Sequence, residues 1–217
     1  MPRRQRWRLP FIYSSADIEA LMHQARSSIA QPLRAATYET LIGLLAATGL
    51  RIGEAIKLDR ADVDWSGQVL LIRESKFGKS RLVPLQDSTL QALKRHAALR
   101  DELQTVSVDA SFFVSLTRKR LCYTVVCQTF RQLVTNAGIG ADAPSAPRIH
   151  DLRHTFAIRT LLSWYRSGED VQAKVPSLST YLGHREPAST CWYLSAAPEL
   201  LALAAERQNT RWTEVRS

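Results

Sequence analysis

The segment RAATYETLIGLLAAT, residues 34–48, most constrains the fold, because it is apolar enough for a largely buried helix that other elements must cover. Gly49 then breaks the helical pattern, and RIGEAIKL (51–58) has the composition of a new helix. The sequence therefore predicts two helices joined by a tight corner. Arg51 lies immediately after that corner.

Other stretches of the chain also show helical patterns. Ser14 and Ser15 precede an amphipathic pattern over 16–29, in which apolar residues recur at helical spacing. Further helices are predicted over 87–103 and 124–138, and a loop rich in Pro, Ala and Gly over 139–148. The chain from His150 to Gln208 is expected to be helical, with breaks at Gly168, Pro176, Gly183 and Pro187.

The period of the pattern changes after Trp65. Residues 66–75 and 81–85 contain β-rich runs, and a basic, glycine-containing connection over 76–80 joins them, which is typical of a β-hairpin. SFFVSL (111–116) is expected to form a short third strand. We therefore predict a mainly α fold with a small antiparallel three-stranded β-sheet.

Composition favours a polyanionic partner. The chain has 217 residues, enough for one large domain or two small ones, and 45% of them are hydrophobic, enough for a core. Lys and Arg number 29 against 20 Asp and Glu, a formal net charge of +9. Such an excess attracts polyanions at long range and releases their counterions on binding. Nucleic acid is the first candidate.

The cysteines are expected to be reduced thiols, as in the cytosol, and the hydropathy pattern indicates a soluble protein. Cys122, Cys127 and Cys191 are an odd number with no CxxC pair, which argues against a disulfide framework or a zinc knuckle. The basic N-terminus is not followed by an apolar signal core, and no stretch reaches the ~18 apolar residues of a membrane span. We expect a soluble, cytoplasmic protein without a membrane partner.

Four arginines lie among residues 3–8, with Trp7 between them. Prolines flank this run, so it does not fit a helix core, and residues 1–11 are interpreted as a basic arm or the end of a linker. Arg3 and Arg4 are candidates for contact with DNA phosphates or the minor groove. A solvated tail of a larger protein explains the run equally well.

RIHDLRHTFA (148–157) contains Arg148, His150, Arg153 and His154, with Asp151 as the one acid among them. Residues three and four apart share a helix face, so His150, Arg153 and His154 converge there. Such clustered cations suit a phosphate, to which Arg148 would add. Asp151 either holds a histidine tautomer or caps the helix start, and the sequence leaves both open.

A metal site is the alternative interpretation of this histidine pair. His150 and His154 have the i, i+4 spacing of a zinc helix, but DLR lies between them where a metallopeptidase carries its glutamate base. Arg153 between two ligands would oppose a dication. We therefore expect no metal, and nothing in the sequence calls for another cofactor.

Four motifs follow one another in order: ATGLRIGEAIKLDRADVDW (46–65), SKFGKSRLVPL (75–85), RIHDLRHTFAIRTLL (148–162) and YLGHREPASTCWYLS (181–195). With them the sequence resembles the catalytic domain of the tyrosine recombinase (phage-integrase-type) family, over roughly residues 12–205. The resemblance implies the tyrosine recombinase catalytic-domain fold over 12–217. It also implies six catalytic residues: Arg51, Lys76, His150, Arg153, His184 and Tyr193.

The resemblance gives Arg51 and Arg153 the task of gripping the scissile phosphate. A planar guanidinium matches phosphate oxygens, stays charged, and stabilises the charge of a pentavalent transition state. Glu54, three residues after Arg51, either orients it or is a surface acid. His150 is implied in proton transfer or phosphate binding, which its ordinary pKa near neutrality allows. His154 fits a supporting or structural role better.

Lys76 falls where the family places its hairpin lysine, which protonates the leaving 5′ oxygen. It is preferred to Lys79 for this role, while Lys79 and Arg81 are candidates for phosphate contact or are simply exposed. His184 matches the His or Trp that hydrogen-bonds a phosphate oxygen. Tyr193, nine residues later, matches the nucleophile. A phenol attacks phosphorus poorly unless cations and a base are close, and the other motifs supply these.

The resemblance implies cleavage of duplex DNA through a 3′-phosphotyrosyl bond and strand exchange in a synaptic tetramer, with the isolated chain a monomer. The resemblance does not extend to the family's N-terminal core-binding domain, so we expect the chain to be either a trimmed fragment or a catalytic-domain-only member. In both cases we expect weak, poorly specific and salt-sensitive DNA binding. A C-terminal helix after Pro198 would dock in cis or on a neighbouring protomer. Two alternatives remain: DNA relaxation as in type IB topoisomerases, and a DNA-binding accessory module without turnover.

Overall fold

The computed structural model describes residues 9–75, 79–103 and 110–183, with the side chains of 74, 75 and 79 left out. The chain divides into two compact units, residues 1–155 and 156–217. The first unit contains most of the described elements. Their order is α1 (Ser15–Ser28), α2 (Pro32–Thr48), α3 (Ile52–Lys57), η1 (Arg60–Asp62), β1 (Val63–Asp64), β2 (Val69–Ser75), β3 (Lys79–Pro84), α4 (Asp87–Leu103) and α5 (Tyr123–Asn136).

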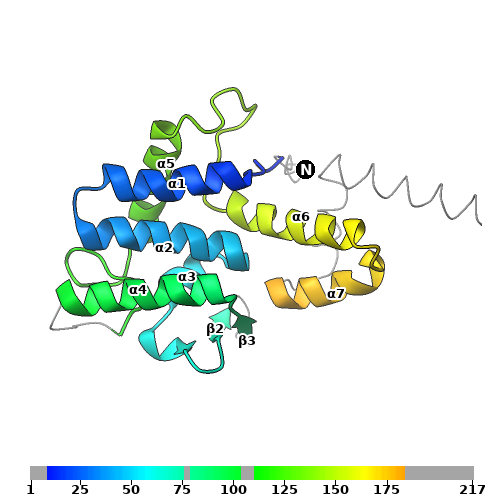
Figure 1. The fold of residues 1–217 in the computed structure, drawn as a ribbon, viewed down its shortest axis with the longest axis horizontal. Helices are drawn as coiled ribbons and strands as arrows, with labels where there is room; N and C mark the ends of the chain where they lie inside the picture. The colour runs from blue at the N-terminus through cyan, green and yellow to red at the C-terminus, as the bar shows by residue number, and fades with distance from the viewer. Residues whose placement is uncertain (1–8, 76–78, 104–109, 184–217) are drawn as a thin grey trace, which may run out of the picture. The chain divides into compact units, whose positions relative to one another are not determined.

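Helix α2 is the central helix of the first unit. It lies between α1 and α4, which run alongside it (Figure 1). Its apolar residues are therefore covered on more than one side, and Leu41, Ile42, Leu44 and Leu45 are all at most 1% exposed. The predicted buried helix at 34–48 is confirmed. Helix α1 begins at a capping box in which Ser14 accepts from the Asp17 amide and the Asp17 carboxylate accepts from the Ser14 amide.

Gly49 ends α2 with φ 62°, a left-handed conformation that glycine adopts without a Cβ clash. Its N–H donates to the Leu45 carbonyl at 2.9 Å. Helix α3 starts three residues later, with Arg51 as its N-cap. The predicted corner before Arg51 is confirmed.

The sheet has three antiparallel strands in the order β1-β2-β3. The predicted hairpin is formed by β2 and β3, with Leu70 opposite Val83 and Ile72 opposite Arg81. The expected third strand at 111–116 is wrong, because Ser111 and Val114 form only isolated bridges. The third strand is the two-residue β1, which precedes a turn in which the Asp64 carboxylate accepts from the amides of Ser66 and Gly67.

The segment mistaken for a strand belongs to the core. Phe112, Phe113 and Val114 are 2%, 0% and 3% exposed, so consecutive side chains are buried on both sides of the backbone. The rings of Phe112 and Phe113 meet edge to face, with centroids 4.9 Å apart. Burial of aromatic side chains, and not strand pairing, explains the composition of this segment.

Helix α6 (Asp151–Arg166) begins in the first unit and continues into the second, where α7 (Val171–Leu182) follows. Gly168 and Gly183 have positive φ and end the helices as predicted. The expected break at Pro176 is wrong, since Pro176 lies inside α7. The helix continues there because apolar residues of α6 and α7 pack into one core; these are Ala157, Ile158, Leu161, Leu162, Val171, Val175, Leu178 and Leu182.

Candidate phosphate-binding site

Arg51 is held at the start of α3 by Glu54. Its backbone N–H donates to one Glu54 carboxylate oxygen at 2.9 Å, and its Nη1 donates to the other at 2.9 Å. Of the two roles that the sequence left open for Glu54, the structure shows the contact that orients Arg51 and not a surface acid. The Arg51 side chain is still 26% exposed, so part of its guanidinium faces solvent.

Glu54 also binds Arg81 of β3. Two parallel hydrogen bonds, 3.0 and 2.9 Å long, join the Arg81 guanidinium to the Glu54 carboxylate. Burial raises the pKa of Glu54, but the hydrogen bonds from Arg81 and from the Arg51 backbone outweigh burial and lower it to about 2. Glu54 is therefore ionised at neutral pH and fixes two arginines from different elements. Arg81, with 13% of its side chain exposed, is less accessible than Arg51.

Arg153 comes from α6 and is 2% exposed. Its Nη1 donates to the carbonyl oxygen of Gly49 at 2.8 Å, so it meets the corner that carries Arg51. A buried charge is tolerated where hydrogen bonds satisfy it. The fold thus brings together the two arginines singled out in the sequence, although 102 positions separate 51 from 153.

His150 and His154 lie one helical turn apart, and their rings meet edge to face with centroids 4.8 Å apart. His150 reaches the surface, whereas His154 is half-buried. Desolvation of the ring by the surrounding protein lowers the pKa of His150 to about 4, and the positive charge of Arg153 is the next largest cause. Desolvation of the ring, followed by the electrostatic effect of His150, lowers the pKa of His154 to about 4. Both imidazoles are therefore neutral at pH 7.

Asp151 takes one of the two roles that the sequence left open for it, at the start of α6. Its carboxylate accepts from the Arg148 backbone N–H at 2.9 Å and from Arg148 Nη2 at 2.8 Å, so it organises the start of α6. A carboxylate is also favoured there by the helix dipole. Arg148 keeps 45% of its side chain exposed and remains accessible to an anion.

Tyr13 is a buried contact of this site that the sequence did not indicate. Its backbone N–H donates to Thr155 Oγ1 at 3.0 Å, and its phenol donates to the Arg148 carbonyl at 3.1 Å. A lone tyrosine outside the four motifs carries no sequence signal for such a role. The sequence also did not indicate that Glu54 binds Arg81 as well as Arg51, because that contact depends on where the hairpin packs.

Several predicted site residues lie outside the described part of the chain. These are Arg3, Arg4, Lys76, His184 and Tyr193, together with the side chain of Lys79 and the predicted helix after Pro198. Their assignments remain predictions. Within the described ranges the structure gathers Arg51, Arg81, Arg148, His150, Arg153 and His154.

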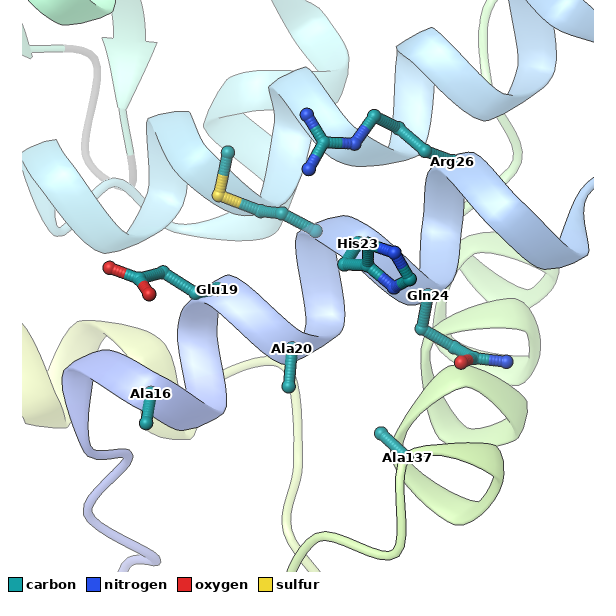
Figure 2. Close-up of a pocket in the computed structure, with 8 residues that line it drawn as sticks. Ala16, Glu19, Ala20, His23, Gln24, Arg26 and Ala137 are labelled. Atoms are coloured by element: carbon teal, nitrogen blue, oxygen red, sulfur yellow. The ribbon is translucent and has the colours of Figure 1, made fainter.

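A hollow of about 530 Å³ adjoins His150, and its lining also includes Arg131 and Arg148. A second hollow, of about 620 Å³, lies on α1 beside Ala137; Figure 2 shows Ala16 and Ala20 among its lining residues. The second hollow contains none of the predicted site residues. Among the described residues, no group of three or more His, Cys, Asp or Glu side chains is placed to hold a metal ion.

The arrangement suits a tetrahedral oxyanion. Arg51 and Arg153 supply fixed positive charge, Arg148 supplies a further accessible one, and two neutral imidazoles lie beside them. The model of the phage integrase family matches residues 13–199 of the chain.

The chain belongs to the phage integrase family. One relative of the chain is y4rE of Sinorhizobium fredii (strain NBRC 101917 / NGR234), which is named an integrase/recombinase. The two are 45% identical over 199 residues, which cover 91% of this chain and 64% of y4rE. The chain thus spans less than two thirds of that relative's length.

Solved structures confirm the expected fold of this phage integrase family member. The crystal structure of XerA recombinase aligns with a TM-score of 0.72 and 27% identity, over 96% of this chain and 67% of that one. A XerH site-specific recombinase bound to palindromic difH substrate, in a post-cleavage complex, aligns with a TM-score of 0.70 over 91% of this chain and 53% of that one. Its 21% identity shows the fold alone. No described helix of the chain is both long enough and apolar enough to cross a membrane.

Proposed function

We propose that the chain is the catalytic domain of a site-specific DNA recombinase, which breaks and rejoins strands through a 3′-phosphotyrosyl intermediate. The observation that carries the proposal is the meeting of Arg153 with the corner that holds Arg51, through the hydrogen bond from Arg153 to Gly49. Two guanidiniums from distant parts of a chain, set beside neutral histidines, are matched to a phosphodiester. Membership of the phage integrase family supports the same reaction.

In the proposed reaction Arg51 and Arg153 bind the non-bridging oxygens of one phosphate. The phenol oxygen of Tyr193 attacks phosphorus, so a new O–P bond forms and the bond to the 5′ oxygen breaks. Lys76 protonates the departing 5′ oxygen. His150 is neutral in the free protein, so it suits accepting the phenol proton or hydrogen-bonding the phosphate more than donating a proton to the leaving group.

The second half of the reaction reverses the first on another strand. A 5′ hydroxyl attacks the phosphotyrosyl bond, Tyr193 leaves with a proton, and a new phosphodiester is formed. The energy of the broken bond is retained, so neither a metal nor a nucleotide is required. His184 would hydrogen-bond the phosphate, and Lys79, Arg81, Arg148 and His154, with Arg3 and Arg4 on the arm, would contribute to DNA binding.

The proposed partner is duplex DNA, and the proposed assembly on it is a tetramer of four protomers. Residues 1–11 are proposed to be the arm or linker that leads into the catalytic domain at 12–217. The DNA-bound XerH structure, which shares this fold, is a recombinase on its substrate. Since most of the affinity would come from phosphate contacts, binding should weaken steeply as salt rises.

A trapping assay tests the proposal. The chain is incubated in EDTA with a pool of nicked duplexes randomised on both sides of the nick, so that cleavage releases a short fragment and strands the protein on DNA. We expect a denaturation-resistant protein–DNA adduct that Tyr193→Phe abolishes. Tyr38→Phe is the control, because Tyr38 is buried on α2 and lies outside the proposed machinery.

The same adduct separates the alternatives. Absence of any adduct with wild-type protein that still binds DNA would favour the accessory module and refute the proposal. Plasmid relaxation by the chain, without joining of two duplexes that carry the selected sequence, would favour the topoisomerase. An adduct that persists in Tyr193→Phe would refute the assignment of the nucleophile.

A further inference from the structure

Tyr13 fastens the chain just after the arm to both sides of the first turn of α6. Its backbone N–H donates to Thr155 Oγ1 at 3.0 Å, and its phenol donates to the Arg148 carbonyl at 3.1 Å. His150 and Arg153 lie between these two attachment points in the sequence. One residue thus holds the segment from 148 to 155 at both of its ends.

Aromatic packing fixes the Tyr13 ring. Tyr13 is 1% exposed, and the rings of Phe11 and Phe130 contact it edge to face at centroid distances of 4.9 and 6.3 Å. Burial, with the negative charge of Asp151, raises the pKa of the phenol, so its O–H remains a donor at neutral pH. The contact with the Arg148 carbonyl is therefore a fixed hydrogen bond in a rigid setting.

The two acceptors belong to the hydrogen bonds that start the helix. The Arg148 carbonyl also accepts from the Asp151 amide at 3.0 Å, and Thr155 Oγ1 also donates to the Asp151 carbonyl at 2.8 Å. The turn that carries His150 is therefore held partly from outside α6. Without the phenol, the start of this turn loses its hydrogen bond to Tyr13, while the Tyr13 N–H bond to Thr155 and the internal bonds of the turn remain.

We propose that Tyr13 is a positioning residue that sets the geometry of His150 and Arg153 for strand cleavage. This inference rests on the proposed recombinase function. Misplacement by a fraction of an ångström is enough to slow a reaction that depends on alignment.

The test compares the removal of two buried phenol oxygens. Tyr13→Phe keeps the ring and deletes the hydrogen bond to Arg148. Tyr38→Phe is the matched control, because Tyr38 is 2% exposed and lies on α2, eleven residues before Gly49. We expect Tyr13→Phe to slow single-turnover adduct formation on the selected nicked duplex about tenfold, with the Kd for that duplex changed less than twofold. Tyr38→Phe should leave the rate within twofold of wild type.

A second pair of variants tests the other attachment point. Thr155→Val removes the hydroxyl that accepts from the Tyr13 N–H, and Thr155→Ser retains it. We expect Thr155→Val to reproduce the slow cleavage and Thr155→Ser to restore most of the wild-type rate. Because both contacts act on one turn, the double variant Tyr13→Phe/Thr155→Val should be less impaired than the product of the single effects. Rates are measured well below every variant's Tm, so that fractional unfolding does not contribute.

Hydrogen exchange separates failure of this inference from failure of the proposed function. In the free protein, amides of residues 148–155 should exchange about tenfold faster in Tyr13→Phe, and should be unchanged in Tyr38→Phe. If wild type forms no adduct, the proposed function fails, and unchanged exchange in Tyr13→Phe would overturn the anchoring role by itself. A wild-type cleavage rate in Tyr13→Phe, or an equal loss in Tyr38→Phe, overturns the positioning role even if exchange changes.

Discussion

Arg153 donates a hydrogen bond of 2.8 Å to the carbonyl oxygen of Gly49, and so joins α6 to the corner between α2 and α3. The arginine is 2% exposed, while Arg51, two residues after Gly49, keeps 26% of its side chain exposed. One guanidinium is therefore held within the protein, and the other is offered to solvent at the same corner.

Arg153→Lys should slow adduct formation by about 100-fold or more, since a lysine cannot both hold the Gly49 carbonyl and present a planar fork to phosphate. The measurement is single-turnover adduct formation on the selected nicked duplex. Arg26→Lys is the control, because Arg26 is 57% exposed and pairs with Glu39 on the surface. A rate for Arg153→Lys within threefold of the control would contradict the assigned role.

Glu54→Gln should lower the free energy of unfolding by about 3 kcal/mol at pH 7, because it removes the charge that Arg51 and Arg81 share in a largely buried setting. Glu39→Gln, which removes the half-buried partner of the exposed Arg26, should cost less than about 1 kcal/mol. Urea denaturation of both variants measures the difference. Equal losses would mean that the Glu54 contacts contribute no more than a surface pair.

The contribution of Glu54 to stability should depend on pH, and the direction follows from its pKa. The folded pKa of Glu54, about 2, lies below its ordinary value of 4.5. Its contribution to stability is therefore present above pH 4.5 and is lost as pH falls from 4.5 towards 2. Unfolding followed across this window should show a shallower loss in Glu54→Gln than in wild type. A loss of the same steepness in both proteins would exclude Glu54 as its source.

His96 should make the protein less stable between pH 6.5 and 4. It is 2% exposed, and burial, followed by the charge of Arg100, lowers its pKa to about 4. The His96 imidazole is therefore protonated in the unfolded state but not in the folded state. This one group should lower the stability by about 1 kcal/mol per pH unit as pH drops through the window, in addition to the slope from His150 and His154. Urea midpoints at pH 7 and 4.5 measure the fall.

His96→Leu tests that attribution. Thr37 Oγ1 donates to the Leu33 carbonyl at 2.7 Å, so it accepts from His96 Nε2 at 3.1 Å, and this leaves Nδ1 without a hydrogen-bond partner among the described residues. Leucine removes both the titration and that unpaired atom. The variant should lose about 1 kcal/mol less per pH unit than wild type, while the neutral histidines 150 and 154 keep a residual slope.

Arg148→Ala should weaken DNA binding and reduce the salt dependence by about one unit of slope in log Kd against log salt, as expected for the loss of one phosphate contact. Arg60→Ala is the matched control: the two side chains are 45% and 44% exposed, and each is paired with an aspartate. Fluorescence anisotropy at several salt concentrations measures both. Identical slopes for the two variants would remove Arg148 from the DNA contact.

The sequence predicted the helices best where period and end signals agreed. Helix α4 (Asp87–Leu103) matches its predicted bounds, and α2 matches within two residues. The third strand failed because Val63 and Asp64 are too short a pair to show alternation, whereas the run from Phe112 to Val114 has strand composition but fills the core. The predicted break at Pro176 was wrong because the packing of α7 against α6 outweighed the helix-breaking tendency of proline.

Some contacts of the candidate site were also predictable from the sequence, and others were not. The motifs around Arg51 and Arg153 picked out residues that the fold does bring to one corner, and the i, i+3 spacing indicated Glu54. That Glu54 also binds Arg81 depends on where the hairpin lies against α3, which no local pattern encodes. The contacts of Tyr13 join positions 142 and 135 residues away, so spacing could not reveal them.

Gly49 does two things with one residue. Its left-handed φ of 62° turns the chain between α2 and α3, and its carbonyl oxygen receives Arg153. A side chain at this position would strain the turn that also places the Arg153 acceptor, so a substitution that costs stability would disturb that hydrogen bond as well. Asparagine, which tolerates the left-handed region better than other residues with a side chain, is the substitution that evolution has most freedom to try here.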